Sequence, residues 1–151
     1  MIDIFKFHGV EFVGSSGGQE FADCPFCAHK NKLYVNPKTG GWDCKSCQKK
    51  GYPTHFLGFL AEKFAKALVG APLSKLVEDR GISAATFQKW GVGWTGQRYT
   101  LPVKDHSGKY IDLRVWKPGG LVMSTKGAST GLYGIEKIKQ GKGVVYLCEG
   151  E

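Results

Sequence analysis

The sequence lacks the long hydrophobic runs that a secretory signal or a membrane-spanning helix requires. It also lacks long internal repeats and low-complexity tracts, and it is poor in acidic residues, with 13 Asp and Glu against 21 Lys and Arg. These absences argue against secretion and membrane insertion, and we expect a cytoplasmic protein. The net charge of +8 and the pI near 9.3 favour a polyanionic partner.

Two further absences narrow the class of partner and the kind of activity. No basic amphipathic helix of the kind that lies on anionic membranes is present, which favours nucleic acid over a membrane surface. The pair Gly141-Lys142 lacks the rest of a P-loop, which excludes an ATPase motor encoded by these residues.

Four of the five cysteines occur in a regular pattern, C-x2-C-x16-C-x2-C, made by Cys24, Cys27, Cys44 and Cys47. This spacing is typical of a zinc ribbon, in which two facing turns supply four thiolates to one tetrahedral ion. Because no ligand position is left for water, the expected zinc is structural. Two disulfides are the alternative. The lack of a signal segment argues against them, and so does the presence of a fifth, unpaired cysteine, Cys148.

The segment between the two cysteine pairs predicts a hairpin. Alternation over 32–35 places Leu33 and Val35 on one face, beneath the zinc, with the neighbouring residues on the other. The outer face should carry a set suited to stacking bases and neutralising phosphates, namely Lys30, Lys32, Tyr34, Trp42 and Lys45. For Tyr34 and Trp42 the alternative is that they cover the small ribbon core.

The remaining residues predict helices followed by strands. Thr54 is a candidate cap for a helix with apolar residues at helical spacing, Pro72 opens a second helix that Gly81 ends, and Ser83 caps a third over 84–90. Strands are expected over 99–103, 110–116 and 121–123. The apolar run 143–148 is typical of a strand buried on both faces.

The order of these parts resembles the amino-terminal portion of a DNA primase of the bacterial and phage type, and most closely the phage primase-helicases. In that family a zinc-binding domain precedes a Toprim-bearing RNA polymerase domain. The stretches that carry the resemblance follow the family order: Cys24-Pro25-Phe26-Cys27, Trp42-Asp43-Cys44-Lys45-Ser46-Cys47, Gly51, Arg80-Gly81-Ile82-Ser83, Phe87-Gln88-Lys89-Trp90-Gly91-Val92-Gly93, Leu101-Pro102-Val103 with Asp105 and Gly108, Leu113-Arg114, Gly131-Leu132-Tyr133-Gly134, and 144–151.

The chain departs from the family pattern at two points. Bacterial primases usually have a histidine as the second zinc ligand, and Cys27 instead matches the phage pattern. The Asp-x-Asp carboxylates that help hold catalytic magnesium would lie after residue 151. The resemblance therefore implies that this sequence alone is inactive, and that magnesium belongs only to the complete catalytic core.

The resemblance implies template-directed synthesis of RNA primers by two-metal phosphoryl transfer. Glu149 matches the first Toprim carboxylate and is the candidate catalytic residue, while Glu151 fits the phage variant with a less defined role. Residues 98–142 contain nine Lys or Arg and three acids, and in the matching segment Arg114, Lys117 and Lys126 are candidates to hold template or nucleotide.

The expected fold class is α+β. A zinc ribbon, expected as a domain over 1–53, precedes a small helical segment and the amino-terminal α/β part of a primase core, expected over 54–151 and ending in the first Toprim strand. The expected partners are single-stranded DNA template, ribonucleoside triphosphates and a replicative helicase. The alternative function is a non-catalytic zinc ribbon that binds single-stranded nucleic acid or regulates replication.

Overall fold

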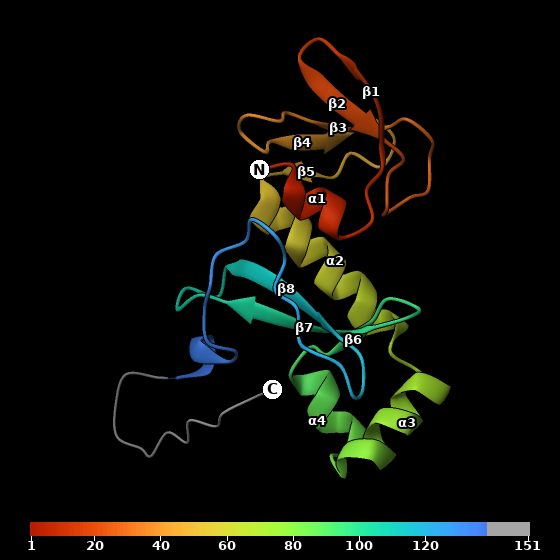
Figure 1. The fold of residues 1–151 in the computed structure, drawn as a ribbon, viewed down its shortest axis with the longest axis vertical. Coiled ribbons are helices and arrows are strands. Elements are labelled where there is room, and N and C mark those ends of the chain that lie inside the picture. Colours follow the sequence, from red (N-terminus) through yellow and green to blue (C-terminus); the bar gives the residue numbers. More distant parts are fainter. Residues whose placement is uncertain (139–151) are drawn as a thin grey trace.

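The structure, a computed structural model, describes residues 1–138 and is a mixed α+β fold. A short helix, α1 (Asp3–Phe7), is followed by a five-stranded antiparallel sheet in which neighbours in sequence are neighbours in space (Figure 1). Its strands are β1 (Phe12–Ser16), β2 (Gln19–Ala22), β3 (Leu33–Val35), β4 (Trp42–Cys44) and β5 (Lys50–Gly51).

The predicted hairpin between the cysteine pairs is present as β3 and β4. Leu33 and Val35 are fully buried while Tyr34 between them is half-buried, as the alternation predicted. The turn that joins the strands is held by Asn36, whose Oδ1 accepts hydrogen bonds from the backbone N–H groups of Lys38 (2.9 Å) and Thr39 (3.1 Å). This register fixes which side chains of the ribbon face the core.

Helix α2 (Pro53–Ala67) runs from the ribbon to the second half of the molecule (Figure 1). Its cap is Tyr52 and not Thr54, because Pro53 occupies the first helical position, where its fixed φ and missing N–H carry no penalty. The His55 Nδ1 accepts a hydrogen bond from the Tyr52 N–H at 3.3 Å, which reinforces this start.

The second half consists of two helices, a three-stranded sheet in the order β6-β7-β8, and a 3-10 turn. Gly81 (φ 64°) ends α3 and the Ser83 Oγ accepts a hydrogen bond from the Thr86 N–H at 3.2 Å, so both predicted helix boundaries are confirmed. The elements are α3 (Ala71–Arg80), α4 (Ala84–Lys89), β6 (Gly93–Trp94), β7 (Tyr99–Lys104), β8 (Tyr110–Trp116) and η1 (Ile135–Lys137).

The predicted third strand over 121–123 is wrong. The segment makes a single bridge, in which Val115 and Met123 exchange backbone hydrogen bonds of 2.9 Å each. Leu121 is 87% exposed, because the Pro118-Gly119-Gly120 turn carries the chain away from β8. The strand predicted over 143–148, with Glu149 and Glu151, lies outside the described residues.

One hydrophobic core joins the ribbon, α2 and β8. Phe56 on α2 is fully buried, and its ring lies 4.5 Å from that of Phe5 and 5.6 Å from that of Trp42, centroid to centroid. Leu113 of β8 belongs to the same cluster. The predicted boundary between residues 53 and 54 therefore falls at a helix that packs against both parts, and the division into two domains stays a prediction.

Among residues 1–138, no helix combines the length and the apolar character needed to cross a bilayer.

The shared core predicts the effect of truncating Phe56. Phe56→Ala should lower the free energy of unfolding by about 3–5 kcal/mol, because it leaves a cavity between the ribbon, α1 and α2. Phe56→Leu should cost much less. Denaturant unfolding followed by tryptophan fluorescence measures both. Two separate transitions, only one of them shifted by the alanine variant, would contradict a single shared core.

Candidate metal centre and nucleic-acid interface

The two cysteine pairs lie on turns with the same backbone design. In the first, the Ala28 N–H donates to the Cys24 carbonyl (2.9 Å) and the Cys24 N–H donates to the carbonyl of His29 (3.1 Å). In the second, Gln48 and Lys49 make the equivalent bonds with Cys44, at 3.0 and 2.8 Å. Ala28 and Gln48 are both left-handed, with φ of 59° and 61°. Each turn thus presents two thiols in the same direction.

The four sulfur atoms fit a tetrahedral zinc ion. Each lies within 4.8 Å of the others, and the cross-turn distances are 3.9 Å for Cys24–Cys47 and 3.7 Å for Cys27–Cys44. A tetrahedron with Zn–S bonds of about 2.3 Å requires S–S separations of about 3.8 Å. These distances are far longer than a disulfide bond of about 2.05 Å, and the cysteines are free thiols. The residues present could therefore hold structural zinc, as predicted.

The surroundings of the thiols differ between the turns. Burial raises the pKa of Cys24 and of Cys47, whereas the backbone N–H of His29 lowers the pKa of Cys27 to about 6. Backbone N–H groups of Ser46 and Cys47 donate to the Cys44 Sγ, both at 3.4 Å. Such donors orient sulfur ligands and stabilise their negative charge. When bound, zinc would supply a structural cross-link between the turns and no open coordination site.

The outer face of the ribbon carries a row of aromatic and charged side chains. The strand register aligns Phe21, Tyr34, Asp43 and Lys50 across β2, β3, β4 and β5. The rings of Phe21 and Tyr34 are 6.0 Å apart, and the Lys45 Nζ lies 5.6 Å from the centroid of Tyr34. Sequence reasoning found Tyr34 and Lys45 but missed Phe21 and Lys50, which only cross-strand register brings to this face.

The other predicted ribbon residues divide between surface and core. Lys30 and Lys32 are exposed, at the edge of the hairpin. Lys45 also pairs with the Asp43 carboxylate at 2.6 Å, and this hydrogen bond raises the pKa of Lys45. Trp42 is only 3% exposed, and its Nε1–H donates to the Tyr52 carbonyl at 3.0 Å. Of the two alternatives for Trp42, the structure favours the core.

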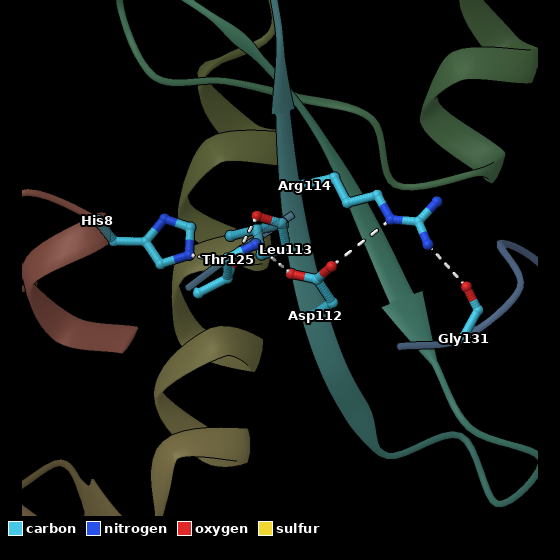
Figure 2. A network of polar contacts seen from close by, with 6 residues as sticks. All are labelled: His8, Asp112, Leu113, Arg114, Thr125 and Gly131. Carbon is cyan, nitrogen blue, oxygen red and sulfur yellow. Dashed lines mark hydrogen bonds and ion pairs between the residues drawn. The ribbon is translucent and has the colours of Figure 1, made fainter. Parts of the chain in front are cut away.

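A polar network joins α1 to β8 (Figure 2). The Thr125 hydroxyl donates to the Leu113 carbonyl (3.0 Å), so the His8 Nε2–H must donate to the Thr125 oxygen (2.9 Å). The Thr125 N–H donates to the Asp112 Oδ1 at 2.9 Å, and the Asp112 Oδ2 lies 3.5 Å from the Arg114 Nε. The network ties the end of the amino-terminal helix to the second sheet, and the sequence gives no local sign of the His8 contact because its partner is 117 residues away.

The predicted basic residues of the second half lie in different settings. Arg114 is largely buried, and its Nη2–H donates to the Gly131 carbonyl at 2.7 Å in addition to the contact with Asp112 (Figure 2). Lys126 is exposed, with its Nζ 3.6 Å from an oxygen of Asp3, and Lys117 is exposed in the turn after β8. Contacts of these three residues with template or nucleotide stay predictions. Glu149, the predicted catalytic residue, lies outside the described residues.

The metal centre predicts a dependence of the fold on zinc. The purified protein should contain zinc at a one-to-one ratio, and Cys44→Ser should lose the metal and the near-UV circular dichroism of Trp42, because the ribbon cannot close without four ligands. Cys148→Ser, outside the cysteine pattern, is the matched control and should retain both. Full retention of zinc and of the circular dichroism by Cys44→Ser would contradict the assignment.

The network predicts a pH-dependent contribution of His8 to stability. Burial lowers the pKa of His8 to about 4, despite the opposing effect of the Asp112 carboxylate. Between about pH 6.5 and 4 the unfolded chain binds a proton at this position and the folded chain does not, so the free energy of unfolding falls as the pH is lowered.

In His8→Gln, whose amide can still donate to the Thr125 hydroxyl, that part of the pH dependence should disappear. Urea midpoints measured at pH 7 and pH 5 compare the two proteins. An identical loss of stability in both would rule out a titrating contribution from His8.

Comparison with known proteins gives a neighbour among solved structures but none among family models or curated proteins. No protein-family model matches the sequence, and no curated protein does. Among solved structures, the chain is similar to the zinc-binding and RNA polymerase domains of the primase of Aquifex aeolicus. The sequences are 13% identical, the match covers 83% of this chain and 54% of that one, and the TM-score is 0.39. The chain thus spans about half the length of that primase structure.

Proposed function

We propose that this chain is the template-recognising front part of a DNA primase of the Toprim type, acting in the cytoplasm of a bacterium or of a phage-infected host. The ribbon binds single-stranded DNA, and the following α/β part contributes to RNA primer synthesis from ribonucleoside triphosphates. A replicative helicase is the expected partner. Catalysis needs magnesium-binding carboxylates, of which Glu149 would be the first.

The observation that carries the proposal is the outer face of the ribbon. Tyr34 and Phe21 offer ring surface, and Lys45, Lys50 and Lys32 outnumber Asp43, which pairs with Lys45, among the charged groups around it. Aromatic rings stack on bases of any sequence, and lysines neutralise the phosphates between them, so such a face suits a single strand. The zinc site beneath it would hold the face rigid. The primase-like order of motifs in the sequence supports primer synthesis as the process in which this binding takes part.

The alternative is a non-catalytic module that binds single-stranded nucleic acid or regulates replication. It is favoured by the fact that the four-cysteine site and the outer face are complete within residues 1–138. A longer gene product with an Asp-x-Asp motif downstream would favour the primase, and one without it would favour the module.

The proposal predicts a role for Tyr34 in binding single strands. Tyr34→Leu should weaken binding of a mixed-sequence oligonucleotide about tenfold, because it removes a stacking platform. Tyr52→Leu, which changes a tyrosine that is 60% exposed and not in the aligned row, is the control. Fluorescence anisotropy at several salt concentrations measures both.

Equal affinities of the two variants would remove the ribbon face from the binding site. Wild-type binding that does not weaken between about 50 and 500 mM salt would contradict any phosphate-contacting function. Robust RNA synthesis by these 151 residues with magnesium would contradict the need for further carboxylates.

A further inference from the structure

Two hollows adjoin on the side of α2 that faces the β7–β8 hairpin. The first has a volume of about 320 Å³ and lies beside the first half of the helix, and the second has about 160 Å³ and lies between the second half and α4. Glu62 and Tyr110 line both hollows, so the two are neighbours that share these side chains. We call them together the α2 groove. From Thr54 to Ala65 the helix is about 17 Å long, room for a short extended ligand.

The floor of the groove depends on a glycine inside α2. A Cβ on Gly58 would lie 2.9 Å from the Cδ2 of Tyr110, too close for the ring to stay where it is. Glycine in the middle of a helix costs about 1 kcal/mol relative to alanine. At this position it lets the Cδ2 and Cε2 atoms of Tyr110 approach the helix closely, and Tyr110 borders both hollows.

Three aromatic rings line the groove, and each has a lysine ammonium over its face. The distances from Nζ to ring centroid are 4.3 Å for Lys49 and Phe59, 4.6 Å for Lys104 and Tyr110, and 3.5 Å for Lys137 and Trp90. Energetically significant pairs of this kind occur about once per 70–80 residues. Three around one groove therefore indicate a surface built from rings and cations together.

The positive charge of the groove is concentrated at its second half. Burial lowers the pKa of Lys137, the Glu136 carboxylate opposes this effect, and the neighbouring ammonium groups of Lys89 and Lys104 add to the lowering. Mutual repulsion of this kind is relieved when an anion binds among the cations. Lys109 adds a fourth cation on the hairpin wall of the first half.

Two carboxylates lie among these cations. Glu62 is where the two hollows meet, and the Oε2 of Glu136 is buried without a hydrogen-bond partner among the described residues. A buried acceptor of this kind is costly unless a donor reaches it. The exocyclic amino groups of bases are such donors, and glutamate accepts from them in nucleic-acid complexes.

We propose that the α2 groove is a second binding site for a single strand of nucleic acid, distinct from the outer face of the ribbon. Bases would stack on the rings of Phe59, Tyr110 and Trp90 as the lysines move from the ring faces to the phosphates. Lys49 belongs to the second cysteine turn, so the groove begins beside the ribbon and leads the strand along α2 toward α4. The inference shares its class of ligand with the proposed function but concerns different residues.

The test compares the oligonucleotide binding of two double variants. One replaces two lysines on the hairpin side of the groove, and the other replaces two lysines outside it. Lys104→Gln with Lys109→Gln should weaken oligonucleotide binding about tenfold near 0.1 M salt. It should also reduce the slope of log K against log salt by about 1.4, since each phosphate contact on a single strand contributes about 0.7. Lys6→Gln with Lys66→Gln, both exposed and outside the groove, makes the same change in net charge and should leave the slope nearly unchanged.

A second variant guards against a purely electrostatic or folding effect. Tyr110→Leu keeps an apolar side chain against Gly58 but removes a stacking ring, and should weaken binding severalfold without changing the salt slope. Circular dichroism and the thermal midpoint establish that each variant is folded.

The outcomes separate this inference from the proposed function. Wild-type protein that binds no oligonucleotide would overturn the proposed function, and the groove with it. A second outcome would overturn the groove alone. In that outcome Tyr34→Leu weakens oligonucleotide binding, but the groove variant (Lys104→Gln with Lys109→Gln) binds as tightly, and with the same salt slope, as its control. Weakened binding of ATP with unchanged binding of the oligonucleotide would also overturn it, because the groove would then serve free triphosphates.

Discussion

The convergence of four cysteine thiols in one small volume is the constraint on which the ribbon depends. Burial disfavours the thiolate form of Cys24, and four thiolates within 4.8 Å of one another would repel, so a bound cation would stabilise the deprotonated cluster. Bringing the two turns together fixes the register that pairs Leu33 with Cys44, and the same register turns Tyr34 outward. The orientation of the outer face of the ribbon is therefore tied to the geometry of the cysteine cluster.

Helix α2 connects the ribbon to the second half of the molecule through packing contacts on both sides. Phe56 on this helix packs into the core of the ribbon. Gly58, two residues further on, allows Tyr110 of the β7–β8 hairpin to approach the helix closely. The His8–Thr125 hydrogen bond and the Lys126–Asp3 ion pair join α1 to the segment after β8 from another side. The ribbon and the second sheet are thus connected by packing and by polar contacts as well as by the chain.

Local chemistry in the sequence was enough to predict the four-cysteine cluster, the ribbon hairpin and most helix boundaries. Gly81 and Ser83 act within one turn of the backbone, so their effects can be inferred without the fold. Trp42 could not be assigned to core or surface, because its burial is decided by α2 packing over it from later in the chain. The same holds for His8, whose partner is 117 residues away, and for the α2 groove, whose lining comes from α2, α4, β7, β8 and η1.

The two left-handed residues that follow the cysteine pairs give the ribbon a dependence on metal supply. Neither Ala28 nor Gln48 is glycine, and each left-handed residue of this kind costs about 1–2 kcal/mol. A sheet with three strands of three residues or fewer buries little by itself, so it relies on the core it shares with α1 and α2, and on a bound ion, to offset that cost. By mass action, the fraction of molecules with an ordered ribbon then follows the ratio of free zinc to its dissociation constant. Zinc starvation would then lower the concentration of protein with an ordered ribbon without any change in its synthesis.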